Sequence, residues 1–281
     1  MLLLDAVDHA GAIVVRLVTD SNAMLPADLV DRFGLLVVPL TVVVDGVARL
    51  EDEVDLAAFY TQLRDGAPVT TAAPSPGELL GAYQRAADEG ADQVLSVHIG
   101  SNQSATVGAA HVAAEAIDLP VTIVDTGTAS FIEGCCAWRA AEVLAAGGGV
   151  DAAAAAAQEV AAAAASVFTI GEITRALRSG RLDVLDGSGV PVFASAGPDM
   201  AEIGRATTQA AAVAAMVGRV AEAAGPLRVG VGHADAPDDA AALEAALRSL
   251  PQVAEVTRYV VGPSVAAHTG AGTFGAVYHP I

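Results

Sequence analysis

The sequence predicts an α/β fold with two lobes. Apolar, β-branched runs alternate with helical patterns along the chain, which is typical of a parallel sheet covered by helices. The length of 281 residues exceeds that of most single domains, and three consecutive glycines at 147–149 mark a joint between two halves. We therefore expect an N-terminal extension over residues 1–12, an N-terminal α/β lobe over 13–148 and a C-terminal α/β lobe over 149–281.

The N-terminal lobe is expected to contain a mostly parallel sheet with flanking helices. Four apolar runs have the composition of strands: 13–19, 36–44, 93–99 and 121–124. Short polar side chains and prolines separate these runs. Ser21 is expected to cap a helix start, and Pro26 stands where the next helix begins. Residues 45–46 have the composition of a tight hairpin turn, and Ser75 with Glu78 has the spacing of a capping box.

An alanine-rich segment, 151–165, opens the C-terminal lobe. Alanine is the strongest helix former, so we expect a thin helix here; a low-complexity linker is the alternative. The strands and helices that follow leave the strand directions open. They are expected at 167–170, 227–231, 256–261 and 275–278 for strands, and at 172–178 and 238–250 for helices.

Charge and cysteine content exclude several classes of protein. The formal net charge is -19 and all 14 basic residues are arginine, so nucleic acid phosphates would be repelled. Cys135 and Cys136 are adjacent, which suits neither a zinc site nor a disulfide between them, and we expect buried thiols in a reducing cytoplasm. Residues 1–12 lack the basic start of a secretory signal, and no apolar stretch is long enough to span a bilayer.

No metal ion or cofactor is expected. The acidic run 51–53 is expected to be solvated, because a metal site needs ligands gathered from several loops. Gly230 and Gly232 before His233 resemble half of a dinucleotide fingerprint, but the third glycine is absent. We therefore do not expect nucleotide binding there.

Three separated segments place small hydroxyl or imidazole side chains on turns broken by glycine or proline: 71–75, 101–106 and 268–273. Loops at the carboxyl ends of strands form the ligand crevice of an open α/β sheet, and free amides at helix starts attract anions. Ser101 and Ser104 either donate to such an anion or cap the following helix. Thr71 is not needed for the cap at Ser75, so it is free to face a ligand. The three segments together predict a site for an anionic head group.

The same segments favour binding over catalysis. None contains a paired acid and base, or a nucleophile with its activator. Two alternatives remain open: a hydrolase or phosphotransferase that uses a serine and His268, and a carrier or sensor of another small anion. The first lacks a nucleophile elbow, because residues 100–104 do not follow Gly-x-Ser-x-Gly.

The ordered set of motifs resembles the DegV family of fatty-acid-binding proteins. The resemblance runs from residue 14 to residue 281 and is carried by the segments 18–21, 25–26, 38–40, 71–75, 101–106, 124–126, 178–181 and 268–273. It implies a cytoplasmic protein that holds one long-chain fatty acid between two α/β lobes. It also implies a partner, the ATP-dependent subunit of fatty acid kinase, which phosphorylates the bound acid, and hence a binding subunit with no catalysis of its own.

The resemblance also assigns roles to residues by motif position. Thr71, Ser101 and His268 are expected at the fatty acid carboxylate, and Arg181, which closes an Arg-Ser-Gly-Arg turn, is expected near the head group. Ser104 and Thr106 are further candidates for a head-group or partner contact. The sequence departs from the family's pattern at Gly100, Gln103, Ala105, Ala271 and the pair Ala72-Ala73.

Overall fold

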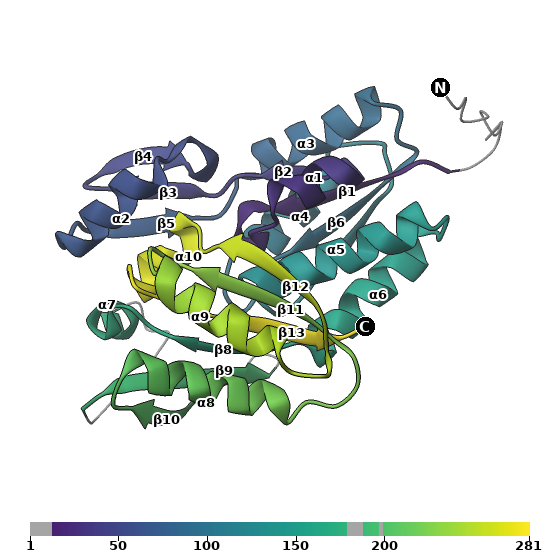
Figure 1. Cartoon of the computed structure of the whole chain (residues 1–281). Coiled ribbons are helices and arrows are strands. Elements are labelled where there is room, and N and C mark those ends of the chain that lie inside the picture. Colours follow the sequence, from purple (N-terminus) through teal and green to yellow (C-terminus); the bar gives the residue numbers. More distant parts are fainter. Residues whose placement is uncertain (1–12, 179–187, 197–198) are drawn as a thin grey trace, which may run out of the picture.

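The computed structural model describes residues 13–178, 188–196 and 199–281. Its first sheet has four parallel strands (Figure 1). In spatial order they are β2 (Leu36–Val38), β1 (Val15–Asp20), β6 (Gln93–His98) and β7 (Val121–Asp125). One face packs on α3 (Pro76–Asp88) and α4 (Thr106–Ala114), and the other packs on α1 (Ala27–Phe33), α5 (Phe131–Ala145) and α6 (Val150–Ala163). The expected α/β fold with a parallel sheet and flanking helices is confirmed.

The second sheet has six strands, of which β11 and β12 are parallel and the other neighbours antiparallel. In spatial order they are β10 (Asp199–Ala206), β9 (Val190–Ala196), β8 (Ala165–Thr169), β13 (Phe274–Pro280), β11 (Leu227–His233) and β12 (Val253–Val260). Two helices, α8 (Gln209–Ala221) and α9 (Pro237–Arg248), cover one face (Figure 1). The opposite face carries the short helices α7 (Ile173–Arg178) and α10 (Pro263–Thr269) near its edge.

A small antiparallel sheet stands beside the parallel one. It contains β4 (Val47–Leu50), β3 (Thr41–Val44) and β5 (Val69–Ala72), and it accompanies α2 (Leu56–Arg64). Short 3-10 turns, η1 (Ser21–Ala23) and η2 (Glu51–Glu53), follow β1 and β4. The prediction of one strand over 36–44 is wrong: Pro39, which has no amide to donate, separates β2 from β3, and the two strands join different sheets.

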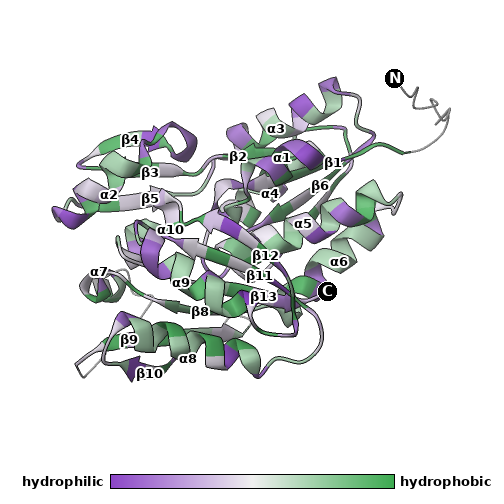
Figure 2. Ribbon diagram, in the orientation of Figure 1, coloured by the Kyte–Doolittle hydropathy of each residue, from purple (hydrophilic) through white to green (hydrophobic). Residues whose placement is uncertain are grey.

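Several local predictions are confirmed. Ser75 and Glu78 form a full capping box, and residues 45–46 turn the chain between β3 and β4. The alanine-rich segment is the helix α6, whose apolar stripe packs on α5 (Figure 2). Cys135 and Cys136 are buried, unpaired thiols within α5. The lobe boundary at 148/149 stays a prediction: it falls at the start of α6, which packs with the parallel sheet, and the first strand of the second sheet begins at Ala165.

The strands β5, β9 and β10 were not expected from the sequence. Val69–Ala72 is only four residues long, and its exposed and half-buried positions alternate, so it lacks a strong apolar run. β9 contains Pro191 and three small residues, and β10 contains three charged ones. These strands are stabilised by hydrogen bonds to neighbouring strands. The local sequence gives no sign of that stabilisation, because it depends on residues elsewhere in the chain.

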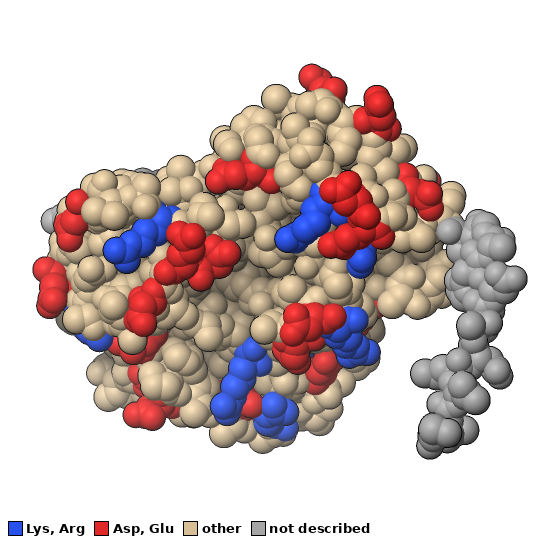
Figure 3. Space-filling model, turned by 90° about the horizontal axis from the view of Figure 1, so that it is seen from above, with Lys and Arg blue, Asp and Glu red and all other residues tan. Residues whose placement is uncertain are grey.

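Charged side chains are interspersed over the surface (Figure 3). Most of the described arginines are paired with carboxylates: Arg16, Arg64, Arg139, Arg175, Arg205, Arg219, Arg228, Arg248 and Arg258. Paired arginines offer no continuous basic face to a polyanion. Within the described part of the chain, no helix is both long and apolar enough to cross a membrane.

A chain of buried polar groups runs through the parallel sheet. The Tyr83 hydroxyl lies 2.9 Å from the Ser96 hydroxyl, which lies 2.7 Å from Nε2 of His98, and Nδ1 of His98 lies 2.9 Å from the Asp20 carboxylate. Glu133 of α5 is fully buried beside Asp20. Burial, and then the negative charge of Asp20, raise the pKa of Glu133 well above its ordinary value, which favours the protonated form of this carboxyl.

The raised pKa of Glu133 predicts a pH-dependent stability. The folded protein keeps a proton that the unfolded chain releases near the ordinary pKa, so stability falls as pH rises from about 5 toward the folded-state pKa. Glu133→Gln keeps the shape without the titration. The melting temperature of this variant should gain on wild type by at least about 2 °C between about pH 5 and about pH 8.

The exposed Glu115 supplies the control. Glu115→Gln should follow wild type at both pH values in thermal unfolding monitored by circular dichroism. A Glu133→Gln difference that stays constant with pH would contradict a protonated Glu133.

Candidate functional site

Two adjoining chambers lie between the parallel sheet and the six-stranded sheet. The large chamber has a volume of about 640 Å³, and the small chamber about 340 Å³. Their linings share Gln103, Ala129, Ser130, Val265, His268 and Thr269. The combined cavity is within the range of about 300–1,000 Å³ that is usual for small-molecule sites.

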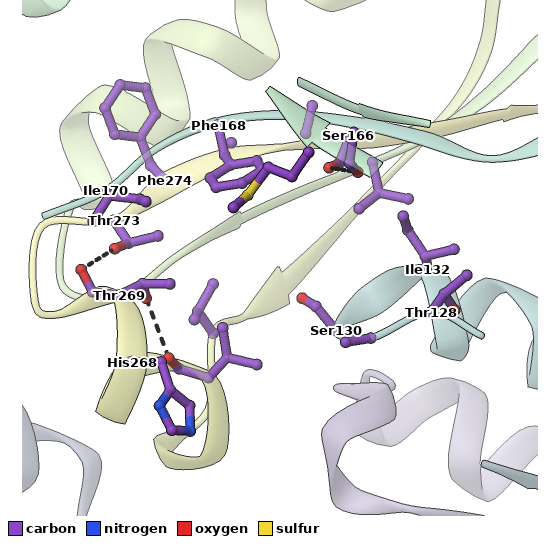
Figure 4. Close-up of a pocket in the computed structure, with 18 of the residues that line it drawn as sticks. Thr128, Ser130, Ile132, Ser166, Phe168, Ile170, His268, Thr269, Thr273 and Phe274 are labelled. Atoms are coloured by element: carbon purple, nitrogen blue, oxygen red, sulfur yellow. Dashed lines mark hydrogen bonds between the residues drawn. The ribbon is translucent and has the colours of Figure 1, made fainter. Parts of the chain in front are cut away.

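The floor of the large chamber is the inner face of the six-stranded sheet. Side chains alternate along β8, so Ser166 and Phe168 face the cavity, while Val167 packs into the core under α8 and α9. Gly275 lies opposite Phe168 on β13, and a Cβ there would collide with Phe168. The glycine therefore allows β13 to approach the β8 backbone and the Cβ of Phe168 closely. Ile132, Ile170, Met200, Val261 and Phe274 complete an apolar lining (Figure 4).

The small chamber brings together two of the residues singled out from the sequence. Oγ1 of Thr71 lies 3.3 Å from Nε2 of His268, although 197 positions separate them in the chain. Thr71 is on β5, and both side chains are half-buried. His268 was expected on a glycine-rich turn; it lies instead in the last turn of α10, and Gly270 ends that helix. Pro263 begins the helix at its first position, where the missing amide has no cost.

One buried carboxylate holds α10 in place. Glu51, only 7% exposed, accepts a hydrogen bond of 2.6 Å from the Ser264 amide and another from the Ser21 hydroxyl. Burial raises the pKa of Glu51, although these hydrogen bonds oppose that rise. The expectation that run 51–53 is solvated thus holds for Asp52 and Glu53 but is wrong for Glu51. Ser21 does not cap a helix; its oxygen accepts the Leu40 amide instead.

Asn22 joins this network to the start of α5. Its amide nitrogen donates to the Ser264 hydroxyl at 3.3 Å, and its carbonyl oxygen accepts the Ser130 amide at 2.7 Å. Ser130 has φ 61° and ψ -154°, a conformation that costs a non-glycine residue about 1–3 kcal/mol. Asn22 and Ser130 both line the small chamber. Sequence reasoning missed them, although Asn22 follows the end of a strand just as Ser101 does.

Ser101 and Ser104 occupy different environments. Ser101 is exposed, and both its amide, at 3.1 Å, and its hydroxyl donate to Asp125. Burial alone would raise the pKa of Asp125, but hydrogen bonds from Ser101 and the Gly127 amide hold it below its ordinary value. Ser104, in contrast, lines the small chamber, whereas Ser101 is absent from the described lining of either chamber.

Two further positions singled out from the sequence, Thr106 and Gly100, lie at the ends of the loop that contains Ser101 and Ser104. Thr106 is fully buried at the start of α4, and its hydroxyl lies 2.8 Å from that of Ser104. A side chain at Gly100 would collide with the backbone of Gly127, so this departure from the family's serine fits the close approach of two loops. Arg181 lies outside the described residues.

Neutral donors dominate the cavity. Among its described lining residues, the ionisable ones are His268 and Tyr259. Hydroxyls, amides and one imidazole can hold a single carboxylate, because hydrogen-bond donors offset the cost of removing its charge from water. The hydroxyl beside His268 belongs to a threonine rather than to the serine that the hydrolase alternative requires. No group of three His, Cys, Asp or Glu side chains in the described part of the chain is arranged to hold a metal ion.

Comparison with known proteins shows the family of this chain. The family model described as "Uncharacterised protein, DegV family" matches residues 14–280. The chain belongs to the DegV family. A DegV domain-containing protein of Streptomyces coelicolor is 37% identical over 274 residues, which cover 94% of this chain and 97% of the relative. A DegV domain-containing protein of Mycobacterium tuberculosis is 33% identical over 271 residues, covering 93% of this chain and 95% of the relative.

Solved structures of DegV proteins have the same fold. A DegV family protein from Thermus thermophilus, described as binding a fatty acid, is 31% identical and superimposes with a TM-score of 0.86 over 96% of this chain and 100% of that one. DegV of Bacillus subtilis is 23% identical, with a TM-score of 0.84 over 96% of this chain and 100% of that one. The two-lobed α/β architecture is therefore the DegV fold.

The role of Glu51 in holding α10 can be tested without a ligand. Glu51→Ala leaves the buried Ser264 amide without its acceptor, which should lower the free energy of unfolding by about 1–3 kcal/mol. Backbone amides of α10 should exchange with solvent roughly tenfold faster or more, as measured by hydrogen exchange with mass spectrometry.

Asp52→Ala, on the same 3-10 turn but exposed, is the matched control and should leave both quantities near wild type. Unchanged exchange in α10 of the Glu51→Ala protein would show that other contacts hold this helix.

Proposed function

We propose that this DegV protein binds a long-chain fatty acid. The carboxylate lies in the small chamber, where Thr71, His268 and Ser104 donate to it, and the acyl chain extends through the large chamber. The observation that carries the proposal is that the Thr71–His268 pair lines a chamber that adjoins, through His268 itself, a second chamber with an apolar floor. The fatty acid binding described for the Thermus thermophilus relative supports the same ligand class.

The energetics of such a ligand suit the cavity. Each methylene group removed from water contributes about 0.8 kcal/mol, so a tail of about 16 carbons contributes on the order of 12 kcal/mol before the costs of ordering it. Affinity then comes from the tail. The donors at the carboxylate set orientation, because a charge left without hydrogen bonds in the cavity would be costly.

Lipid retention tests the proposal. Acyl chains should be recovered by mass spectrometry from the denatured, purified protein. Thr71→Val and His268→Ala should each weaken binding of a fluorescent fatty acid by about tenfold, since each removes one hydrogen bond to a charged group.

Matched controls are available for both positions. Thr70 is exposed on the same strand and His111 is exposed on α4, so Thr70→Val and His111→Ala should bind as wild type does. Equal affinity of all four variants would refute the head-group assignment. Ser104→Ala compared with Ser101→Ala decides which serine reaches the carboxylate; the lining of the small chamber leads us to expect the larger loss for Ser104→Ala.

The second part of the proposal is that the bound carboxylate is presented to a kinase partner in the cytoplasm. The partner transfers the γ-phosphoryl group of ATP to a carboxylate oxygen, which yields an acyl phosphate and ADP. The DegV resemblance of the motifs supports this role, as does a cavity that offers donors to the carboxylate but, in its described lining, no acidic side chain to act as a base.

Phosphoryl transfer tests this second part. Loaded protein with ATP alone should form no acyl phosphate, and adding the fatty acid kinase subunit of the same organism should produce it. Turnover by the purified protein alone, lost in His268→Ala, would favour the enzyme alternative. Displacement of the fluorescent fatty acid by a small metabolite but not by fatty acids would favour a carrier of another anion.

A further inference from the structure

The floor of the large chamber contains a pair of hydroxyl groups among apolar side chains. Ser166 of β8 lies directly opposite Ser195 of β9 in the antiparallel ladder, and their oxygens are 2.6 Å apart. Both residues line the cavity, and Figure 4 shows Ser166 on the opposite side of it from His268. The same row across the sheet continues with Val277 of β13 and Met200 of β10.

In the proposed complex, this serine pair contacts the acyl chain of the ligand. Ser166 and Phe168 are successive inward-facing residues of β8, and the neighbouring row across the sheet contains Gly275, Phe168 and Phe193. A hydroxyl that meets only methylene groups loses its hydrogen bonds to water without replacement. Serine at two adjacent places on this floor is therefore a departure from an apolar surface.

The two hydroxyls cannot satisfy each other completely. Each has one proton to donate and two lone pairs to accept with. The bond between Ser166 and Ser195 uses one proton, so whichever residue accepts it still has a proton for a third partner. Within the described part of the chain, each of these hydroxyls has the other as its hydrogen-bond partner. The remaining donor is available to a ligand in the chamber.

The pair lies on the opposite side of the cavity from His268 (Figure 4). In β13, the strand begins at Phe274 and Val277 is its member in the hydroxyl row. The three residues from Phe274 to Val277 span about 10 Å of strand, so the row lies well inside the sheet. With the carboxylate held at His268, the oxygen that reaches Ser166 and Ser195 is one on the acyl chain itself.

We propose that Ser166 and Ser195 form a second polar subsite, and that the ligand is a long-chain fatty acid with a hydroxyl or keto oxygen near the middle of its chain. The inference rests on the proposed fatty acid function and refines its substrate class. One serine donates to the chain oxygen, and a hydroxyl on the chain can donate to the other serine. A fully saturated, unsubstituted chain fills the same space but leaves the serine donor unused.

Competition binding tests the subsite. Three octadecanoic acids of equal length displace a fluorescent fatty acid: one unsubstituted, one with a hydroxyl near the middle of the chain, and one with a hydroxyl beside the carboxylate. The mid-chain hydroxy acid should bind about tenfold more tightly than the other two. Ser166→Ala combined with Ser195→Ala should abolish this preference, so that the mid-chain hydroxy acid binds no more tightly than the unsubstituted acid.

Ser249→Ala, at an exposed serine after α9, should keep the preference and controls for loss of a hydroxyl elsewhere. Equal affinity of wild type for the three acids would overturn the inference while leaving the proposed function intact, as would a preference that survives in the double variant. Failure of all three acids to bind would overturn the inference and the proposed function together. Since the first comparison uses wild-type protein, it does not depend on the folding of any variant.

Discussion

The buried carboxylate of Glu51 is the contact on which the position of His268 depends. α10 has only seven residues, and a helix of that length is not stable by its own hydrogen bonds. Glu51 binds its first turn, Asn22 binds Ser264 from the end of β1, and the Tyr60 hydroxyl donates to the Val261 carbonyl just before it. These bonds attach the helix to three elements from the first quarter of the chain. The imidazole is thereby placed against a hydroxyl on β5.

The two faces of the six-stranded sheet have different roles, because one packs in the core and the other lines the cavity. Its outer face packs with α8 and α9 into a continuous apolar core. Its inner face bears Phe168 and the Ser166–Ser195 pair, and these side chains line a cavity rather than a core. Because side chains alternate along a strand, residues on the inner face can vary in polarity without disturbing the packing of the outer face. Ligand selectivity can therefore change while the fold is retained.

The sequence predicted those features whose cause is local. The capping box at Ser75, the turn at 45–46 and the alanine-rich helix depend on neighbours a few residues away, and all three form as expected. The prediction of a single strand over 36–44 was wrong. The apolar pattern continues past Pro39, but this residue has no amide to donate, so the hydrogen-bonded ladder ends before it. At the site, motif order singled out Thr71 and His268, which the fold brings within 3.3 Å. Neither Glu51 nor Ser130 could be found this way, because their roles arise from burial and strain imposed by distant segments.

The sequence by itself therefore determined the fold class, the helix starts at Pro26 and Ser75, the turn at 45–46, and the set of hydroxyl and imidazole side chains available to an anion. Tertiary structure alone decided which of them meet. Ser101 turns to Asp125 while Ser104 lines the chamber, and one residue of an acidic run becomes buried beneath a helix 213 positions away. These side-chain positions follow from loop packing and desolvation. Both depend on all of the surrounding elements, so they produce no periodic pattern in the sequence.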